Sequence, residues 1–244
     1  MACHSVLSIL SVCINSKNMK TIISFLVTLL VTVSAKSQDS LRHEVLLETQ
    51  MGNIRISLYN ETPLHRDNFM KLVKSGFYDG LLFHRVISSF MIQTGDSASR
   101  DARPEQLLGD SPESHKIPAE IHYPQFFHKR GALGAAREPD AENPERQSSM
   151  SQFYIVYGRR FTEDQFNALQ DKLSAPGNSP VQVPRGVKDA YLKDGGTPHL
   201  DGQYTVFGEV VEGLDVVRDI QWVETDSNDR PLVDIRIVRA IVVK

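Results

Sequence analysis

Apolar and polar residues alternate over several short stretches of the chain, a pattern typical of half-buried β-strands. In segment 44–59 (EVLLETQMGNIRISLY) two such runs flank Gly52 and Asn53, a residue pair typical of tight turns, and they predict a hairpin. Comparable runs predict further strands within 81–87, 90–96, 131–137, 151–158, 204–211 and 234–243. Many short strands and few helices favour a β-barrel or a β-sandwich.

Two segments show helical spacing of apolar residues instead. The first begins at Thr62 and Pro63 and ends at Ser75 and Gly76, residue types that start and stop helices. Its apolar stripe is expected to close one end of the sheet. The second is 213–220 (GLDVVRDI), which predicts another helix that belongs to the barrel.

Two polar stretches interrupt the strand pattern. Residues 97–118 read as a long surface loop. Residues 159–196 contain one helical run, 162–173, preceded by a capping box of Thr162 and Gln165, and then a tract rich in proline and glycine. About forty residues rarely support a core of their own, so we expect an insertion within one domain, residues 38–244.

Residues 1–37 are typical of a secretory signal peptide. Lys20 is followed by a mostly apolar run, 21–33, which is shorter than the roughly twenty residues that span a membrane. Small residues follow, and they predict cleavage after Ala35 or Ser37. Met19 directly precedes Lys20, so residues 1–18 are read as an over-extended start.

A lipoprotein signal that ends at Cys13 is the alternative interpretation of the N-terminus. Val12 stands where such a signal needs a small residue, and the apolar run before it is short. We therefore expect an exported protein without a lipid anchor and without a stable membrane span.

Composition excludes several functions. Hydrophobic residues make up 41% and charged residues 23% of the 244 residues, as in ordinary globular proteins. Cys3 and Cys13 are the only cysteines, so the mature chain has neither a disulfide nor a thiolate zinc site. Signal removal takes away three lysines and no acidic residue, leaving 24 basic against 30 acidic side chains. Nucleic acid is therefore not an expected partner, because phosphate binding needs a basic surface.

The most informative string is FHRVISSFMIQTGD, residues 83–96. Strand alternation places Arg85 on one face with Phe83 and Ile87, and it places Met91 and Gln93 together on the next strand. Without its context, such an arginine is as well explained by a structural ion pair as by a function.

The sequence resembles the cyclophilin family, since FHRVISSFMIQTGD, GALGAAR, SQFYIV and HLDGQYTVFGEVVEG occur in the family's order. The resemblance covers roughly residues 44–244, apart from the long loop and the insertion. It implies a mainly β fold, an eight-stranded antiparallel barrel capped by two helices, here with a partly helical insertion. It also implies a peptidyl-prolyl cis/trans isomerase.

The resemblance further implies roles for individual residues. Arg85 would be the catalytic residue, and Gln93 would hold the substrate backbone. The walls of the pocket for the substrate proline would be formed by Phe90, Met91, Tyr154 and Leu200. The neighbouring groove would be lined by Ala136, Arg137 and Gln152.

Three positions depart from the commonest family pattern. His199 replaces a frequent tryptophan, Tyr204 a frequent histidine, and Tyr154 a phenylalanine; His199 and Tyr204 are counted with the substrate-binding positions. Because the tryptophan position affects binding of cyclosporin, we expect weakened sensitivity to that drug.

The implied reaction needs no cofactor and no metal. Amide resonance sets a barrier of roughly 18–20 kcal/mol for rotation about an X-Pro bond. An arginine that donates to the prolyl nitrogen stabilises the twisted state, so neither a nucleophile nor an ion is required. None of the seven histidines beyond the signal shows metal-ligand spacing.

The leading hypothesis is therefore a periplasmic isomerase, expected to be a monomer, that acts on proline-containing unfolded or partly folded proteins and assists the folding of exported proteins. A barrel that only binds proline-rich segments is one alternative, and a general holdase is another. The presence of Arg85 argues against a pure binder, which has no need of it.

Overall fold

The computed structural model describes residues 42–173 and 183–244, and residues 43–244 form one compact unit. The predicted signal peptide, residues 1–37, lies outside the described residues, as does part of the insertion. Within the described ranges, no helix has the length and apolar character needed to cross a membrane.

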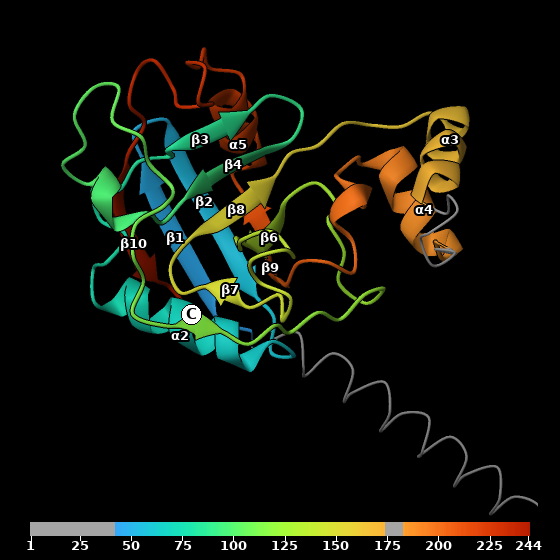
Figure 1. Ribbon diagram of the computed structural model, residues 1–244, viewed down its shortest axis with the longest axis horizontal. Coiled ribbons are helices and arrows are strands. Elements are labelled where there is room, and N and C mark those ends of the chain that lie inside the picture. Colours follow the sequence, from blue (N-terminus) through green and yellow to red (C-terminus); the bar gives the residue numbers. More distant parts are fainter. Residues whose placement is uncertain (1–41, 174–182) are drawn as a thin grey trace, which may run out of the picture. The chain divides into compact units, whose positions relative to one another are not determined.

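The central element is an eight-stranded sheet with the strand order β10-β1-β2-β9-β6-β8-β4-β3, in which every neighbouring pair is antiparallel (Figure 1). Its strands are β1 (Glu44–Thr49), β2 (Gly52–Leu58), β3 (Arg85–Ile87), β4 (Met91–Thr94), β6 (Ala132–Ala135), β8 (Phe153–Val156), β9 (Val206–Glu212) and β10 (Ile237–Val242). This confirms the predicted mainly β, antiparallel class.

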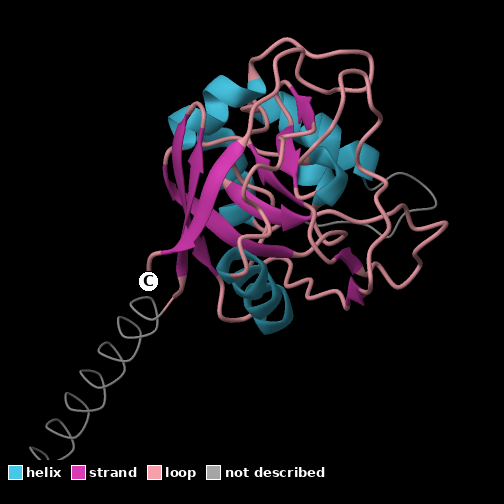
Figure 2. Ribbon diagram, turned by 90° about the vertical axis from the view of Figure 1, so that its left-hand side faces the viewer, coloured by secondary structure: helices cyan, strands magenta, loops and turns pink. Residues whose placement is uncertain are grey.

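The predicted eight-stranded antiparallel barrel is confirmed in a more open form, because the sheet curls into a half-barrel (Figure 2). Its edge strands β3 and β10 form no ladder with each other. The contact at this seam is a single bridge between Leu82 and Arg236, with backbone hydrogen bonds of 2.9 Å from Phe83 N to Ile235 O and from Ile237 N to Leu81 O. Segment 81–84 was therefore predicted as strand but joins the edges without being one.

Two helices cover the sheet, as predicted: α2 (Pro63–Lys74) and α5 (Leu214–Gln221), which lie at the lower and upper ends of the sheet in Figure 1. Phe69 and Val73 from α2, and Val217 and Ile220 from α5, enter the main hydrophobic core. Burial of such apolar side chains is the dominant favourable term in folding.

Local geometry shifts some predicted boundaries. The hairpin turn is Gln50–Met51, and Gly52 already pairs with Thr49 in the ladder. The Thr49 side chain stabilises this turn, because its hydroxyl donates to Gly52 O at 2.7 Å and accepts from Met51 N at 3.1 Å. The loop predicted over 97–118 contains a short 3-10 helix, Ser97–Ser99, and β5 (Lys116–Ile117), which pairs with β7 (Ser148–Ser149).

The described part of the insertion contains two helices, α3 (Glu163–Leu173) and α4 (Arg185–Lys193), of which the second was not predicted. The capping box of α3 is confirmed, because Gln165 N donates to Thr162 Oγ1 at 3.3 Å and Thr162 N to Gln165 Oε1 at 3.1 Å. The insertion buries Phe161, Phe166, Val187 and Tyr191 in one cluster. Tyr123 and Phe127, which precede β6, pack against this cluster, so it is shared with the chain of the sheet.

Candidate active site

A cavity of about 850 Å³ opens in front of β3, β4 and β8. Its lining includes these residues predicted from sequence: Arg85, Phe90, Met91, Gln93, Ala136, Arg137, Gln152, Tyr154, Leu200 and Tyr204. His199 is not among the lining residues, and its predicted role in substrate binding stays a prediction. Its ring packs against Phe90, with the ring centroids 5.4 Å apart, because the short 3-10 helix Pro198–Leu200 turns Leu200 toward the cavity.

Arg85 lies opposite Gln93 in the ladder between β3 and β4, and both line the cavity. The Arg85 side chain is 45% exposed, and its Nε donates to Asp229 Oδ2 at 3.3 Å. Among the described residues, this is the only hydrogen bond of its guanidinium group. The two terminal nitrogens therefore remain available to a bound molecule.

Asp229 was not predicted from sequence, since no local signal connects it to a residue 144 positions earlier. Replacing Asp229 with asparagine should lower kcat/KM about two- to fivefold, because a weaker partner orients the Arg85 guanidinium less firmly. The melting temperature should barely change, since half-exposed ion pairs contribute little to stability. Asp219→Asn, which affects an exposed pair with Arg218, is the control. Equal activity of wild type and Asp229→Asn would contradict this role.

The apolar wall of the cavity is one hydrophobic cluster that includes Phe90, Met91, Tyr154, Leu200 and Tyr204. Met91 and Tyr154 are only 2% and 4% exposed, so the pocket floor is held by packing. Tyr154 lies opposite Gly134 in the ladder between β6 and β8. A Cβ atom on Gly134 would lie 2.3 Å from Tyr154 Cζ, so this ring depends on a glycine beneath it.

Gly134→Ala should therefore displace the Tyr154 ring and lower kcat/KM about tenfold or more. We also expect a loss of about 1–3 kcal/mol in the free energy of unfolding, as in other overpacked sites. Gly186→Ala is the matched control, because a Cβ atom added there meets nothing within 4 Å. Activity assays and urea unfolding of both variants test this, and an unchanged activity of Gly134→Ala would refute it.

Polar groups also line the cavity, some of them directly beside the apolar wall. Gln93 Nε2 donates to Gln152 Oε1 at 3.1 Å, and Gln152 Nε2 donates to Gly109 O at 2.7 Å. Arg137 is held rigidly, with Nη2 2.6 Å from Asp140 Oδ1 and its guanidinium carbon 4.4 Å from the centre of the Tyr204 ring.

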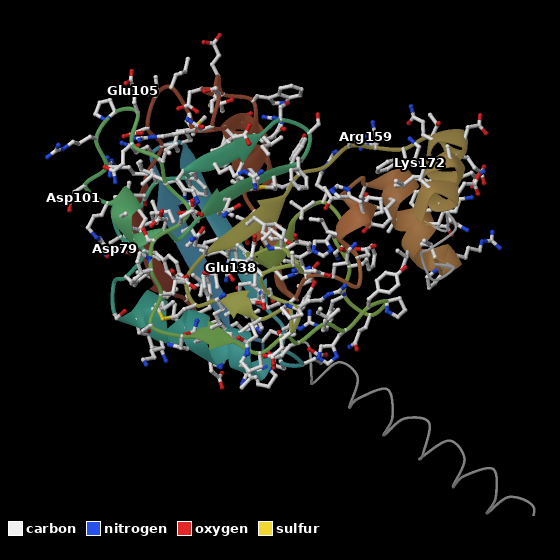
Figure 3. The ribbon with its side chains drawn as sticks, in the orientation of Figure 1. Asp79, Asp101, Glu105, Glu138, Arg159 and Lys172 are labelled. Carbon is white, nitrogen blue, oxygen red and sulfur yellow. The ribbon has the colours of Figure 1, made fainter. Side chains whose placement is uncertain are left out.

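Glu138 forms an ion pair with Lys116 at the cavity rim, and Figure 3 labels it well away from Arg159 and Lys172, which belong to the insertion.

The long loop supplies cavity residues that the sequence did not reveal, among them Gly109, Ser111 and Glu113. Asp96 holds this loop in place, because its carboxylate accepts from Gly109 N and from the Ser111 hydroxyl. Burial raises the pKa of Asp96, but these hydrogen bonds outweigh it, and the net pKa is below the ordinary value.

His84 also lines the cavity and was not predicted as a site residue. It is 3% exposed, and neither ring nitrogen has a hydrogen-bond partner among the described residues. Burial lowers its pKa to about 4; Asp96 opposes this shift, and the positive charges of Arg85 and Arg230 add to it. The imidazole is therefore neutral near pH 7, and its position directly before Arg85 in an apolar run was the signal available in the sequence.

Glu120 has a structural role at the start of α2. Its carboxylate accepts from Leu64 N at 3.1 Å and from His65 N at 3.0 Å, and it lies 2.7 Å from His65 Nδ1. These contacts cap the start of α2, where the Thr62 side chain makes no capping bond. Burial raises the pKa of Glu120, but the hydrogen bonds from His65 and Leu64 lower it by more, so the net pKa is below the ordinary value.

Known proteins resemble this chain in sequence and in fold. Residues 44–242 match the family model described as cyclophilin type peptidyl-prolyl cis-trans isomerase/CLD. Proteins named as peptidyl-prolyl cis-trans isomerases from Staphylococcus aureus (strain USA300) and Staphylococcus haemolyticus (strain JCSC1435) are each 32% identical over 195 residues, which is 80% of this chain and 88% of each relative. The chain thus belongs to the cyclophilin-type peptidyl-prolyl cis-trans isomerase family, and it is an enzyme of that class, a peptidyl-prolyl cis/trans isomerase.

Solved structures agree on the fold. A crystal structure of a Cryptosporidium parvum cyclophilin-type isomerase superposes with a TM-score of 0.58 at 22% identity, covering 83% of this chain and 98% of that one. A second structure of that protein, obtained in the presence of the dipeptide Ala-Pro, gives a TM-score of 0.56 at 22% identity over 82% of this chain and 99% of the other.

Proposed function

We propose that this isomerase acts on X-Pro bonds of unfolded or partly folded proteins in the periplasm and so assists the folding of exported proteins. The observation that supports the catalytic part is the position of Arg85. Its terminal nitrogens are free and it lines the same cavity as the apolar wall of Phe90, Met91 and Leu200. A proline ring fits an apolar wall, and a cation beside it suits the prolyl nitrogen.

In the proposed mechanism, the apolar wall holds the prolyl ring and Gln93 holds the substrate backbone. The guanidinium of Arg85 donates a hydrogen bond to the prolyl nitrogen, whose lone pair becomes available only when the peptide bond is twisted. The enzyme therefore binds the twisted state more tightly than the planar states, which lowers the barrier. Arginine suits this role because it remains charged at every working pH and holds its donors in a rigid fork.

Proline-containing chains are the proposed substrates. The cavity continues from the apolar wall into a polar groove lined by Gln152, Arg137 and Ala136, which offers donors and acceptors to an extended backbone. The structural neighbour studied with Ala-Pro supports the same class of substrate. His199 stands where the family often has a tryptophan that affects cyclosporin binding, so weakened sensitivity to this drug remains a prediction.

Export is proposed from the sequence of residues 1–37 and has a direct test. The full-length chain should be found in the periplasmic fraction of a Gram-negative host with its N-terminus at Lys36 or Gln38. A chain without residues 1–37 should remain in the cytoplasm. Retention of the full-length chain in the cytoplasm would refute the proposed location.

The folding role needs its own experiment. The purified protein should accelerate the proline-limited refolding phase of a model substrate protein, and Arg85→Ala should not. Acceleration on short peptides but none on refolding would leave the isomerase activity intact and remove the folding role. Binding of proline peptides without any acceleration would instead favour a binding module.

A further inference from the structure

Four buried side chains connect the insertion to the floor of the cavity. The hydroxyl of Tyr191, in α4, donates to Asp201 Oδ2 at 2.7 Å. Asp201 Oδ1 lies 2.9 Å from His128 Nδ1, and His128 Nε2 lies 2.9 Å from the Tyr154 hydroxyl. We refer to Tyr191, Asp201, His128 and Tyr154 as the relay. Only its last member lines the cavity.

With a neutral imidazole at His128, the relay has one consistent arrangement of protons. The Asp201 carboxylate accepts from the Tyr191 hydroxyl and also from the His128 backbone N at 2.9 Å, so the Nδ1 of His128 must be the protonated nitrogen that faces it. In the neutral imidazole, Nε2 is then an acceptor, and the Tyr154 hydroxyl donates to it. Burial raises the pKa of Tyr154 well above its ordinary value, which keeps this donor protonated.

Burial makes each bond of the relay consequential. His128, Tyr154 and Tyr191 are 1%, 4% and 0% exposed, and the side chain of Asp201 is 7% exposed. Water cannot replace a lost partner at such positions, so an orphaned group must move or remain unsatisfied. The hydroxyl of Tyr154 would otherwise be a polar group within an apolar cluster.

The base of the insertion is also bonded directly to the segment that bears His128. Thr197 N donates to His128 O at 2.9 Å, and Arg130 N donates to Gly195 O at 2.9 Å. Gly196 packs so closely that a Cβ atom there would lie 2.2 Å from His128 O. The Tyr191 ring also packs against the rings of Phe127 and Phe166, and its centroid lies 5.4 and 5.8 Å from theirs.

We infer that Tyr191 is a positioning residue for the substrate pocket, because through Asp201 and His128 it fixes the Tyr154 ring that forms the pocket floor. The insertion is thereby a structural part of the active site. This inference rests on the proposed function, since it takes the cavity as the place where the prolyl residue binds.

The test is a double-mutant cycle on the isomerisation of a short X-Pro peptide. Tyr191→Phe removes one hydroxyl from the relay and keeps the packed ring. We expect kcat/KM to fall about three- to tenfold, the loss that removal of a hydrogen bond of ordinary net strength commonly causes. The loss should appear in KM, because the pocket floor contacts the planar and twisted states alike.

Tyr154→Phe makes the cycle specific. It removes the donor that the relay fixes, so adding Tyr191→Phe to the Tyr154→Phe protein should change kcat/KM less than about twofold. An equal loss in both backgrounds would mean that Tyr191 acts only on general stability, and it would overturn the inference.

Tyr123→Phe is the matched control. Tyr123 packs against the same cluster of the insertion, but its buried hydroxyl has no hydrogen-bond partner among the described residues. It should leave kcat/KM unchanged. If Tyr191→Phe behaved like Tyr123→Phe, the relay would have no role in positioning.

If Tyr191→Phe folds poorly, Asp201→Asn can replace it in the double-mutant cycle. Its effect on kcat/KM should likewise be smaller in the Tyr154→Phe protein than in wild type. The outcome for Arg85→Ala separates the two levels of the argument. Unchanged kcat/KM in Arg85→Ala would refute the proposed mechanism. If Arg85→Ala lost its activity while Tyr191→Phe kept the wild-type kcat/KM, only the role of the relay would be refuted.

Discussion

Arg85→Ala should lower kcat/KM for the isomerisation of a short X-Pro peptide about 100- to 1000-fold, the usual cost of removing one donor that stabilises a transition state. Of the described arginines and lysines that line the cavity, Arg85 alone has terminal nitrogens without a hydrogen bond or ion pair; Arg137 and Lys116 are held in ion pairs. KM should change less than kcat, because the lost hydrogen bond belongs to the twisted state.

Folding should survive this substitution. Arg85 is 45% exposed and its single ion pair is exposed as well, so the melting temperature should change little. Arg239→Ala is the matched control, since Arg239 is 55% exposed and pairs with Glu48 on the outer strands. Its activity should equal wild type. If Arg85→Ala kept more than about a third of wild-type activity, the guanidinium would not be the principal catalytic group.

Acidification should destabilise the protein through His84. Its pKa is about 4 in the folded state against 6.5 for the ordinary side chain, so the unfolded state binds more protons between these values. The stability that depends on neutral His84 is complete above pH 6.5 and is lost as the pH falls toward 4. Between pH 7 and 4.5, the free energy of unfolding should drop by about 2–3 kcal/mol from this group.

Urea unfolding at the two pH values measures this loss in wild type and in His84→Gln, which has no titratable group at that position. The drop should be smaller in His84→Gln by about 2–3 kcal/mol. Asp96 and Glu120 are present in both proteins, and because their pKa values in the folded state lie below 3.8 and 4.5, their contribution to stability is lost mainly below pH 4.5. His115→Gln, at an exposed position, is the control. An equal drop in wild type and His84→Gln would contradict the assignment.

The sequence was informative about the fold wherever local signals and packing agree. Alternating burial in β1 and β2 matches the alternation of apolar residues, and the Thr62-Pro63 start and Ser75-Gly76 end of α2 were read correctly. Segment 81–84 was misread because its residues are all buried and look like a strand, although they form only a bridge at the seam. Helix α4 was missed because proline and glycine at its start hide its apolar face.

The site shows the same division. The order of motifs along the chain was sufficient to name the residues of one cavity wall, including Arg85, Gln93 and Tyr154. Asp229 and the partners of Tyr154 were beyond reach, because they come from segments far away in sequence and have no motif. His199 was assigned by its place in a motif, and its ring packs against Phe90, which lines the cavity.

Local sequence patterns were enough to identify the family, the antiparallel class of the fold, and most of the predicted residues that line the cavity. These properties follow from local patterns: alternation, caps, and a motif that surrounds one arginine. How far the sheet curls, which carboxylate holds Arg85, and how the insertion reaches Tyr154 became visible only in the tertiary structure. These depend on contacts between distant segments, which are selected by burial and by the need to satisfy each buried polar group, and neither is visible in a short stretch of sequence.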